Sequence, residues 1–95
     1  MKAAKTDANQ KAIVAALRKA GASVQVLSDK GQGVPDLIIG YKGMNYLIEC
    51  KTEKGVLNKR QIKWFSSWLG QVAVVRTIDE ALTVIHPWRK YIERT

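Results

Sequence analysis

The sequence is short of the residues on which several classes of protein depend. It has a single cysteine, Cys50, so no disulfide can form within one chain, and this favours a reducing compartment. No segment approaches the roughly 20 apolar residues that a membrane-spanning helix needs, and no apolar segment of a signal peptide follows the basic N-terminus. With only two prolines and 46% hydrophobic residues, the 95-residue chain is expected to fold as one domain over residues 1–95. We therefore expect a cytoplasmic globular protein.

Acidic residues are also scarce: there are 8, against 16 lysines and arginines, which gives a formal net charge of +8. For so small a domain this excess favours a polyanionic partner, although a merely soluble basic protein would show it too. No recognition-helix pattern and no zinc motif is present, so sequence-specific reading of bases has no support. If the partner is a nucleic acid, we expect recognition of its backbone and shape.

The spacing of apolar residues predicts an α/β fold in the order α-β-β-β-α-β-α, a mixed sheet with a central hairpin flanked by helices. The first helix is expected over residues 7–20, with Thr6 as N-cap and Gly21 as the stop. The other expected elements are strands at 24–28, 36–41, 45–51 and 71–76, a helix from Asn58 to Gly70, and a helix over 78–84 capped by Thr77.

The second predicted helix begins with a capping-box pattern, because Gln61 falls at the third helical position after Asn58. Its apolar stripe consists of Ile62, Phe65, Trp68 and Leu69. Trp64 lies one residue off this stripe. It is therefore either exposed and able to stack on a ligand, or it covers the edge of the core.

Two apolar strands each carry a carboxylate at one end. Asp36 opens the first strand of the predicted hairpin, and Glu49 and Lys51 close the second, so the turn between them brings the three side chains together. Glu49 and Lys51 are two positions apart and point to one face, whereas Cys50 points the other way, into the core. Charged groups at apolar strand ends are unexpected unless they are paired or functional.

Oxygen ligands of this kind suit a divalent cation such as Mg²⁺, which takes one or two carboxylates plus waters and phosphate. Asp36, Glu49 and the backbone carbonyl of Cys50 are the candidate ligands, and Lys51 is placed to hold an attacking water or to stabilise developing negative charge. The alternative is structural: Glu49 and Lys51 form an exposed ion pair of little consequence.

Three segments of the chain resemble the VRR-NUC branch of the PD-(D/E)XK, restriction-endonuclease-like nucleases, especially its small stand-alone phage and bacterial members. They are Gly33-Val34-Pro35-Asp36-Leu37, Ile48-Glu49-Cys50-Lys51 and Leu57-Asn58-Lys59-Arg60-Gln61-Ile62-Lys63-Trp64-Phe65. The first two match the Pro-Asp … (Asp/Glu)-x-Lys signature, and the third matches a helix with a characteristic glutamine. The resemblance runs from the first helix to about Val84, and the three motifs together are more specific than any one alone.

The resemblance implies a restriction-endonuclease-like core and Mg²⁺- or Mn²⁺-dependent DNA cleavage, with Asp36 and Glu49 on the metal, Lys51 on the water and phosphate, and Gln61 at the edge of the site. Relatives often carry a glutamate on the first helix near the metal. Here that helix offers Asp7 and Gln10 instead, so Asp7 is only a doubtful further ligand.

The resemblance also implies a homodimer that cuts branched DNA such as Holliday junctions, in the cytoplasm of a bacterial or phage-infected cell. The alternatives are a non-catalytic basic DNA-binding module and a nuclease acting on linear duplex or single-stranded ends.

A set of cations follows the proposed site along the chain and is expected, with Trp64, to contact the DNA backbone: Lys54, Lys59, Arg60 and Lys63. The single histidine, His86, lies beside Pro87 and is expected to serve as a surface or cap residue rather than a ligand. The aromatic tail residues Trp88, Tyr91 and Ile92 are expected to pack on this chain or on a second copy.

Overall fold

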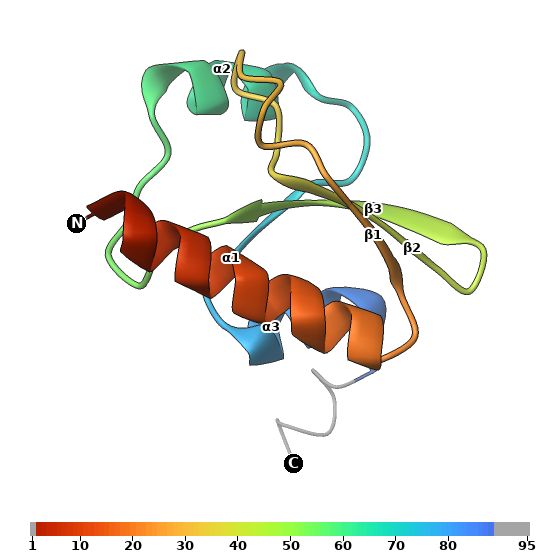
Figure 1. The fold of residues 1–95 in the computed structure, drawn as a ribbon. Coiled ribbons are helices and arrows are strands. Elements are labelled where there is room, and N and C mark those ends of the chain that lie inside the picture. The colour runs from red at the N-terminus through yellow and green to blue at the C-terminus, as the bar shows by residue number, and fades with distance from the viewer. Residues whose placement is uncertain (1, 89–95) are drawn as a thin grey trace.

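The computed structural model describes residues 2–88, which form one four-stranded mixed sheet with helices on both faces (Figure 1). The elements follow in the predicted order, so the expected fold class is confirmed. They are α1 (Lys2–Lys19), β1 (Ser23–Val26), β2 (Leu37–Tyr41), β3 (Met44–Cys50), α2 (Lys59–Ser67), β4 (Ala73–Val75) and α3 (Ile78–Ile85).

The strands lie in the spatial order β1-β2-β3-β4, with β1, β2 and β3 antiparallel and β4 parallel to β3. Leu37 of β2 is opposite Ile48 of β3, so the register places Asp36 opposite Glu49 one step further on. The parallel pairing of β4 joins it only to the last three residues of β3, Ile48–Cys50. The hairpin and β4 therefore meet at the end of β3 that carries the predicted site.

Helices α1 and α3 cover one face of the sheet, and α2 lies on the opposite side (Figure 1). The buried core lies between the sheet and the α1–α3 layer. Its main contributors are Ile13, Val14, Leu17, Leu37, Ile39, Ile48, Cys50, Val75, Ala81 and Ile85. Buried residues alternate along β2, whereas the last three residues of β3 are all buried: Ile48 and Cys50 belong to the core, as predicted for Cys50, and Glu49 between them faces α2.

Helix α1 begins at Lys2, four residues before the predicted cap at Thr6. The reason is local: alanines and lysines precede Thr6, and both are strong helix formers, so the helix continues upstream through it. Its end was predicted correctly. Gly21 adopts a φ of +99°, and the N–H of Ala22 donates to the carbonyl of Leu17 at 3.0 Å.

The turn of the β2–β3 hairpin is tighter than predicted, with only Lys42 and Gly43 between the strands. Both residues have positive φ, +49° and +81°, which is the backbone that a two-residue hairpin turn with the right-handed twist requires. Glycine adopts this conformation without steric cost, whereas Lys42 tolerates it.

Strand β4 is also shorter than predicted, and the Gln71 side chain replaces part of the expected strand by hydrogen-bonding the backbone of β3. The Gln71 amide accepts the N–H of Leu47 at 2.7 Å and donates to the carbonyl of Leu47 at 3.2 Å. Gln71 therefore satisfies the backbone of β3 immediately before β4 begins to pair with it.

Helix α2 departs most from expectation. Its capping box is present as predicted, but it ends at Ser67 rather than near Gly70, and none of its residues is buried. Ile62 is 54% exposed and Leu69 is fully exposed, so the apolar stripe does not pack into the core. The backbone of Trp68 is extended, with φ −79° and ψ 124°, and this carries Leu69 away from the helix.

Helix α3 forms as predicted, with the Thr77 hydroxyl accepting from the N–H of Glu80 at 3.1 Å. His86 is its C-cap, and its Nε2 lies 2.9 Å from the Tyr41 hydroxyl, which confirms a structural role. Trp88 is exposed and stands beside the His86 ring, while Tyr91 and Ile92 lie outside the described residues.

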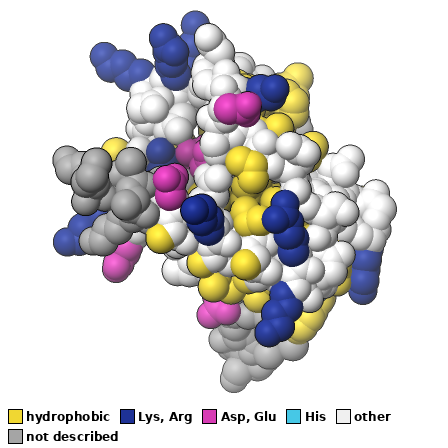
Figure 2. All heavy atoms as spheres, in the orientation of Figure 1, with side chains coloured by type: hydrophobic (Ala, Val, Ile, Leu, Met, Phe, Trp, Pro, Cys, Tyr) yellow, Lys and Arg dark blue, Asp and Glu magenta, His cyan; other side chains and the backbone are white. Residues whose placement is uncertain are grey.

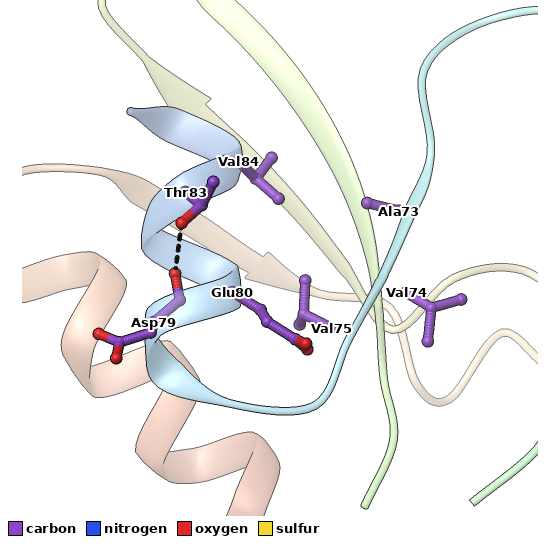
Figure 3. Close-up of a pocket in the computed structure, with 7 residues that line it drawn as sticks. All are labelled: Ala73, Val74, Val75, Asp79, Glu80, Thr83 and Val84. Carbon is purple, nitrogen blue, oxygen red and sulfur yellow. Dashed lines mark hydrogen bonds between the residues drawn. The ribbon is translucent and has the colours of Figure 1, made fainter. Parts of the chain in front are cut away.

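A groove runs between edge strand β4 and α3, with a volume of about 410 Å³ (Figure 3). Valines from both elements line it, and the Glu80 side chain extends across it toward β4, where it accepts the N–H of Arg76 at 2.5 Å. None of the predicted site residues lines this groove.

Among residues 2–88, no helix is both long and apolar enough to cross a membrane.

Candidate metal centre and nucleic-acid surface

The Asp36 carboxylate is anchored against the end of β3. Its Oδ2 accepts the backbone N–H of Cys50 at 2.9 Å, and its Oδ1 lies 3.3 Å from the Ser28 hydroxyl. The bond to Cys50 places the carboxylate directly beside Glu49, as the strand register requires. The hairpin therefore brings Asp36 and Glu49 together as the sequence predicted.

Glu49 is the one buried charged side chain among the described residues, with 2% of its surface exposed. Both of its hydrogen-bonding or ionic contacts go to the same oxygen, Oε2. Gln61 Nε2 donates to Oε2 at 2.9 Å, and Lys51 Nζ lies 3.5 Å from it. The other oxygen, Oε1, is buried and has no hydrogen-bond partner within residues 2–88. A buried carboxylate oxygen without a partner is costly, so it indicates a missing ligand.

The surroundings raise the pKa of Glu49 from 4.5 to about 7. Burial is the main cause, and the neighbouring Asp36 carboxylate adds to it, while Lys51 partly opposes the shift. Burial also raises the pKa of the Cys50 thiol to about 12, so this side chain is not a thiolate ligand. Such an acidic pair accumulates negative charge that a cation would neutralise.

The donor set fits a hard divalent cation. Two carboxylates are available, one with an unused buried oxygen, and waters, a backbone carbonyl and substrate phosphate commonly complete the coordination of Mg²⁺. No group of three or more His, Cys, Asp and Glu side chains that could hold a metal occurs within residues 2–88, so the two carboxylates are the acidic ligands on offer there. The Cys50 carbonyl as a ligand stays a prediction.

Of the two candidates on the first helix, Gln10 is connected to Asp36, but only through the Ser28 hydroxyl. The Ser28 hydroxyl lies 3.2 Å from Gln10 Oε1 as well as 3.3 Å from Asp36 Oδ1, and its single proton serves one acceptor at a time. Asp7 is exposed on α1 and makes no hydrogen bond or ion pair with the described part of the chain. The structure therefore does not group Asp7 with Asp36 and Glu49.

Gln61 caps the start of α2 and also contacts the acidic pair. Its Oε1 accepts the backbone N–H of Asn58 at 2.9 Å while its Nε2 holds Glu49, so the two roles weighed for this residue coexist. The start of α2 is thereby tied to the acidic pair. Because α2 contributes no residue to the core, this bond is a main link between the helix and the sheet.

Two residues that sequence reasoning missed hold the chain around Lys51. Asn9 of α1 donates to the Lys51 carbonyl at 2.9 Å and lies 3.4 Å from the Arg76 carbonyl. The Arg76 guanidinium donates to the carbonyls of Thr52 at 2.7 Å and Gly55 at 2.6 Å. The sequence separations of 21 to 67 residues left no local signal for these contacts.

The predicted DNA-binding cations divide into two places. Lys59, Arg60 and Lys63 are exposed on α2, and Figure 2 shows lysine and arginine side chains gathered at the top of the molecule, over this helix. Lys54 is exposed on the loop after β3, where it lines a separate polar hollow with Asn9 and Arg76. Trp64 is half-buried on α2, stacked on Trp68 with ring centroids 4.6 Å apart.

The element order and the sheet topology can be compared with those of solved structures. The chain is similar to a solved structure described as "VRR_NUC domain", with a TM-score of 0.70 and 24% sequence identity. The match covers 86% of this chain and 95% of that one. No family model matches the sequence. No curated protein matches it either. The chain thus has the fold of a VRR_NUC domain, which confirms the expected resemblance at the level of the fold.

Proposed function

We propose that this protein is a metal-dependent deoxyribonuclease of the VRR-NUC type. The observation that carries the proposal is Glu49 Oε1, a buried carboxylate oxygen with no partner in the described chain, beside the Asp36 carboxylate and within a site that also holds a lysine. Asp36 and Glu49 would hold Mg²⁺ or Mn²⁺, which supplies charge neutralisation of the phosphate and a water of lowered pKa. The fold shared with a VRR_NUC domain supports the same conclusion.

The chain's own residues have distinct tasks in this proposal. Gln61 and Lys51 both engage Glu49 Oε2, which would leave Oε1 free to hold the cation. Lys51 is 18% exposed and can therefore meet a phosphate or its attacking water while its ammonium stabilises negative charge at phosphorus. Asp36 is oriented by the N–H of Cys50, so its carboxylate is fixed before substrate arrives.

The substrate of this proposal is DNA, held by its phosphates. The net charge of +8 and the exposed cations on α2 support a polyanion, and α2 lies on the side of the sheet toward which Glu49 points, because its Gln61 donates to Glu49. We further propose that the substrate is branched, such as a Holliday junction, and that two copies of the chain act together. A two-fold dimer matches the two scissile strands of such a junction by symmetry.

A substrate panel tests the proposal. Labelled four-way junction, flap, linear duplex and single-stranded DNA are incubated with the wild-type protein in Mg²⁺, Mn²⁺ or EDTA. Nicking that needs metal is expected, and the junction should be cut fastest. Binding without nicking in either metal would instead leave a non-catalytic DNA-binding module, and faster cutting of linear ends would replace the junction by that substrate.

A further inference from the structure

A basic, aromatic hollow lies against α2, the helix whose Gln61 holds Glu49, and neither Asp36 nor Glu49 lines it. Gln32, Arg60, Lys63 and Trp64 line it, and its volume is about 360 Å³. It therefore presents two cations, one amide and one indole, with no acidic side chain among its lining residues. Cations suit a phosphate, an amide suits the edge of a base, and an indole suits the face of a base.

The hollow is built by two segments in close contact. The loop before β2 reaches the first turn of α2 at Gly33, where an added Cβ would lie 2.3 Å from the Arg60 carbonyl oxygen. Gly33 also has a φ of +82°, so the site requires glycine for both reasons. This contact brings the loop against α2, so that Gln32 of the loop lines the hollow together with Arg60 and Lys63 of the helix.

The aromatic wall is not part of the core. No residue of α2 is buried, yet Trp64 and Trp68 stack with ring planes 18° apart, and Trp68 is 44% exposed. A stacked pair of indoles at the surface can accept a further aromatic ring. In a duplex both faces of each base are covered by its neighbours, so only an unstacked nucleotide can use such a platform.

The position of the hollow connects it to cleavage. Arg60 lines the hollow, and the next residue, Gln61, donates to Glu49 at 2.9 Å. We propose that the hollow receives an unpaired nucleotide of the DNA substrate, with its base against Trp64 and its phosphate on Arg60 and Lys63. This inference rests on the proposed nuclease and adds a requirement to its branched substrate: unpaired nucleotides beside the scissile phosphate, as in a flap or in a junction whose branch point has opened.

Charge decides between DNA and a second copy of the chain as the occupant. A two-fold interface through this surface would place Arg60 and Lys63 near their own copies, on a protein of net charge +8. Like charges brought together in this way oppose association, whereas a polyanion is attracted.

Binding in EDTA tests the hollow separately from catalysis. The affinities of wild-type protein and of Trp64→Ala are measured for a labelled flap with a single-stranded arm and for a duplex of equal length. Trp64→Ala should weaken flap binding about 5- to 150-fold, the range for one stacked base, and change duplex binding less than twofold. The matched control is Trp88→Ala, because Trp88 is an exposed tryptophan outside the hollow. Equal losses on both DNAs, or no loss on the flap, would overturn the proposal.

A cross-linking measurement on the wild-type protein covers the case in which Trp64→Ala does not fold. Single-stranded DNA carrying 4-thiothymidine is irradiated with the protein in EDTA, and the modified residue is located by mass spectrometry. Cross-links are expected at Trp64 and the residues lining the hollow. Cross-links confined to other parts of the chain would contradict the proposal.

The two proposals fail in different ways. Metal-dependent nicking by a protein that shows neither flap preference nor cross-links at the hollow would remove the nucleotide site and leave the nuclease. Flap preference that depends on Trp64, in a protein that nicks no DNA with any metal, would remove the nuclease and leave the nucleotide site.

Discussion

The two faces of this sheet differ in the polarity of the side chains that they bury. The face beneath α1 and α3 is apolar and closed: Ile13, Leu17, Leu37, Ile39 and Ile48 are all fully buried. The face toward α2 buries a carboxylate instead, and the helix that covers it contributes no residue to the core. The comparison teaches that stability and chemistry are separated by the alternation of side chains along β3, where Ile48 and Cys50 point one way and Glu49 the other.

The same substitution on the two helices should give the largest difference in stability. Ile13 of α1 is fully buried and Ile62 of α2 is 54% exposed. Ile13→Ala should lower the free energy of unfolding by about 2–5 kcal/mol, because it leaves a cavity, whereas Ile62→Ala should change it by less than about 0.5 kcal/mol. Urea titration of both variants measures this. Similar losses for the two would show that α2 is packed more tightly than its exposure indicates.

Removing the lysine of the α2 face should affect cleavage rather than folding. Lys51→Met is expected to slow metal-dependent nicking about 10²- to 10³-fold, the usual effect of removing one group that stabilises transition-state charge. Because Lys51 lowers the pKa of Glu49, its loss should also move the pH profile of nicking to higher pH. Lys42→Met, a change of an exposed lysine at the hairpin turn, is the matched control and should cleave normally. A fully active Lys51→Met variant would contradict the assignment.

The buried carboxylate should make the metal-free protein less stable as the pH rises. The pKa of Glu49 is about 7 in the folded state and 4.5 as an ordinary value, so the folded state binds this proton more tightly. The associated stability is present in full below pH 4.5 and is lost as the pH rises to about 7. In EDTA, Glu49→Gln should therefore be more stable than wild type by about 3 kcal/mol at pH 8 and nearly equal to it at pH 4.

Urea titrations of the two proteins at both pH values measure this difference. Protonation of the other ionisable groups affects both proteins equally and therefore cancels in the comparison. A Glu49→Gln variant less stable than wild type at pH 8 would show that the ionised carboxylate is well satisfied without a metal. In that case the unpaired Oε1 of Glu49 would no longer indicate a metal site.

The smallest effect compares the caps of two helices. Asn58→Ala and Thr77→Ala each remove an N-cap side chain and should each cost about 1 kcal/mol in urea titrations. Only the first also loosens Gln61, the residue that holds Glu49. Asn58→Ala should therefore slow nicking several-fold while Thr77→Ala leaves it unchanged. Equal nicking rates for both variants would show that cleavage does not depend on the position of Gln61.

Patterns that are local in the sequence predicted much of this structure. The order of elements, the hairpin and both helix caps follow from spacing and turn chemistry within a few residues, and the meeting of Asp36 with Glu49 follows from the hairpin alone. The start of α1 was misplaced because Thr6 resembles a cap although good helix formers precede it.

Tertiary context decided the rest. The spacing of Ile62, Trp68 and Leu69 indicates an apolar stripe, but it does not say whether another element covers that stripe. The contacts of Asn9 and Arg76 join segments 21 to 67 residues apart and depend on the assembled sheet. Neither residue type signals such a role in the sequence.

The most direct test of the central claim is single-turnover nicking of labelled DNA by wild type and Asp36→Asn as Mn²⁺ is increased. Asp29→Asn is the matched control, since Asp29 is an exposed aspartate in the loop before β2. The acidic pair predicts saturable, metal-dependent nicking by wild type and by Asp29→Asn, and none above background by Asp36→Asn, with DNA binding in EDTA retained by all three. Nicking by Asp36→Asn with the metal dependence and rate of wild type would contradict the account.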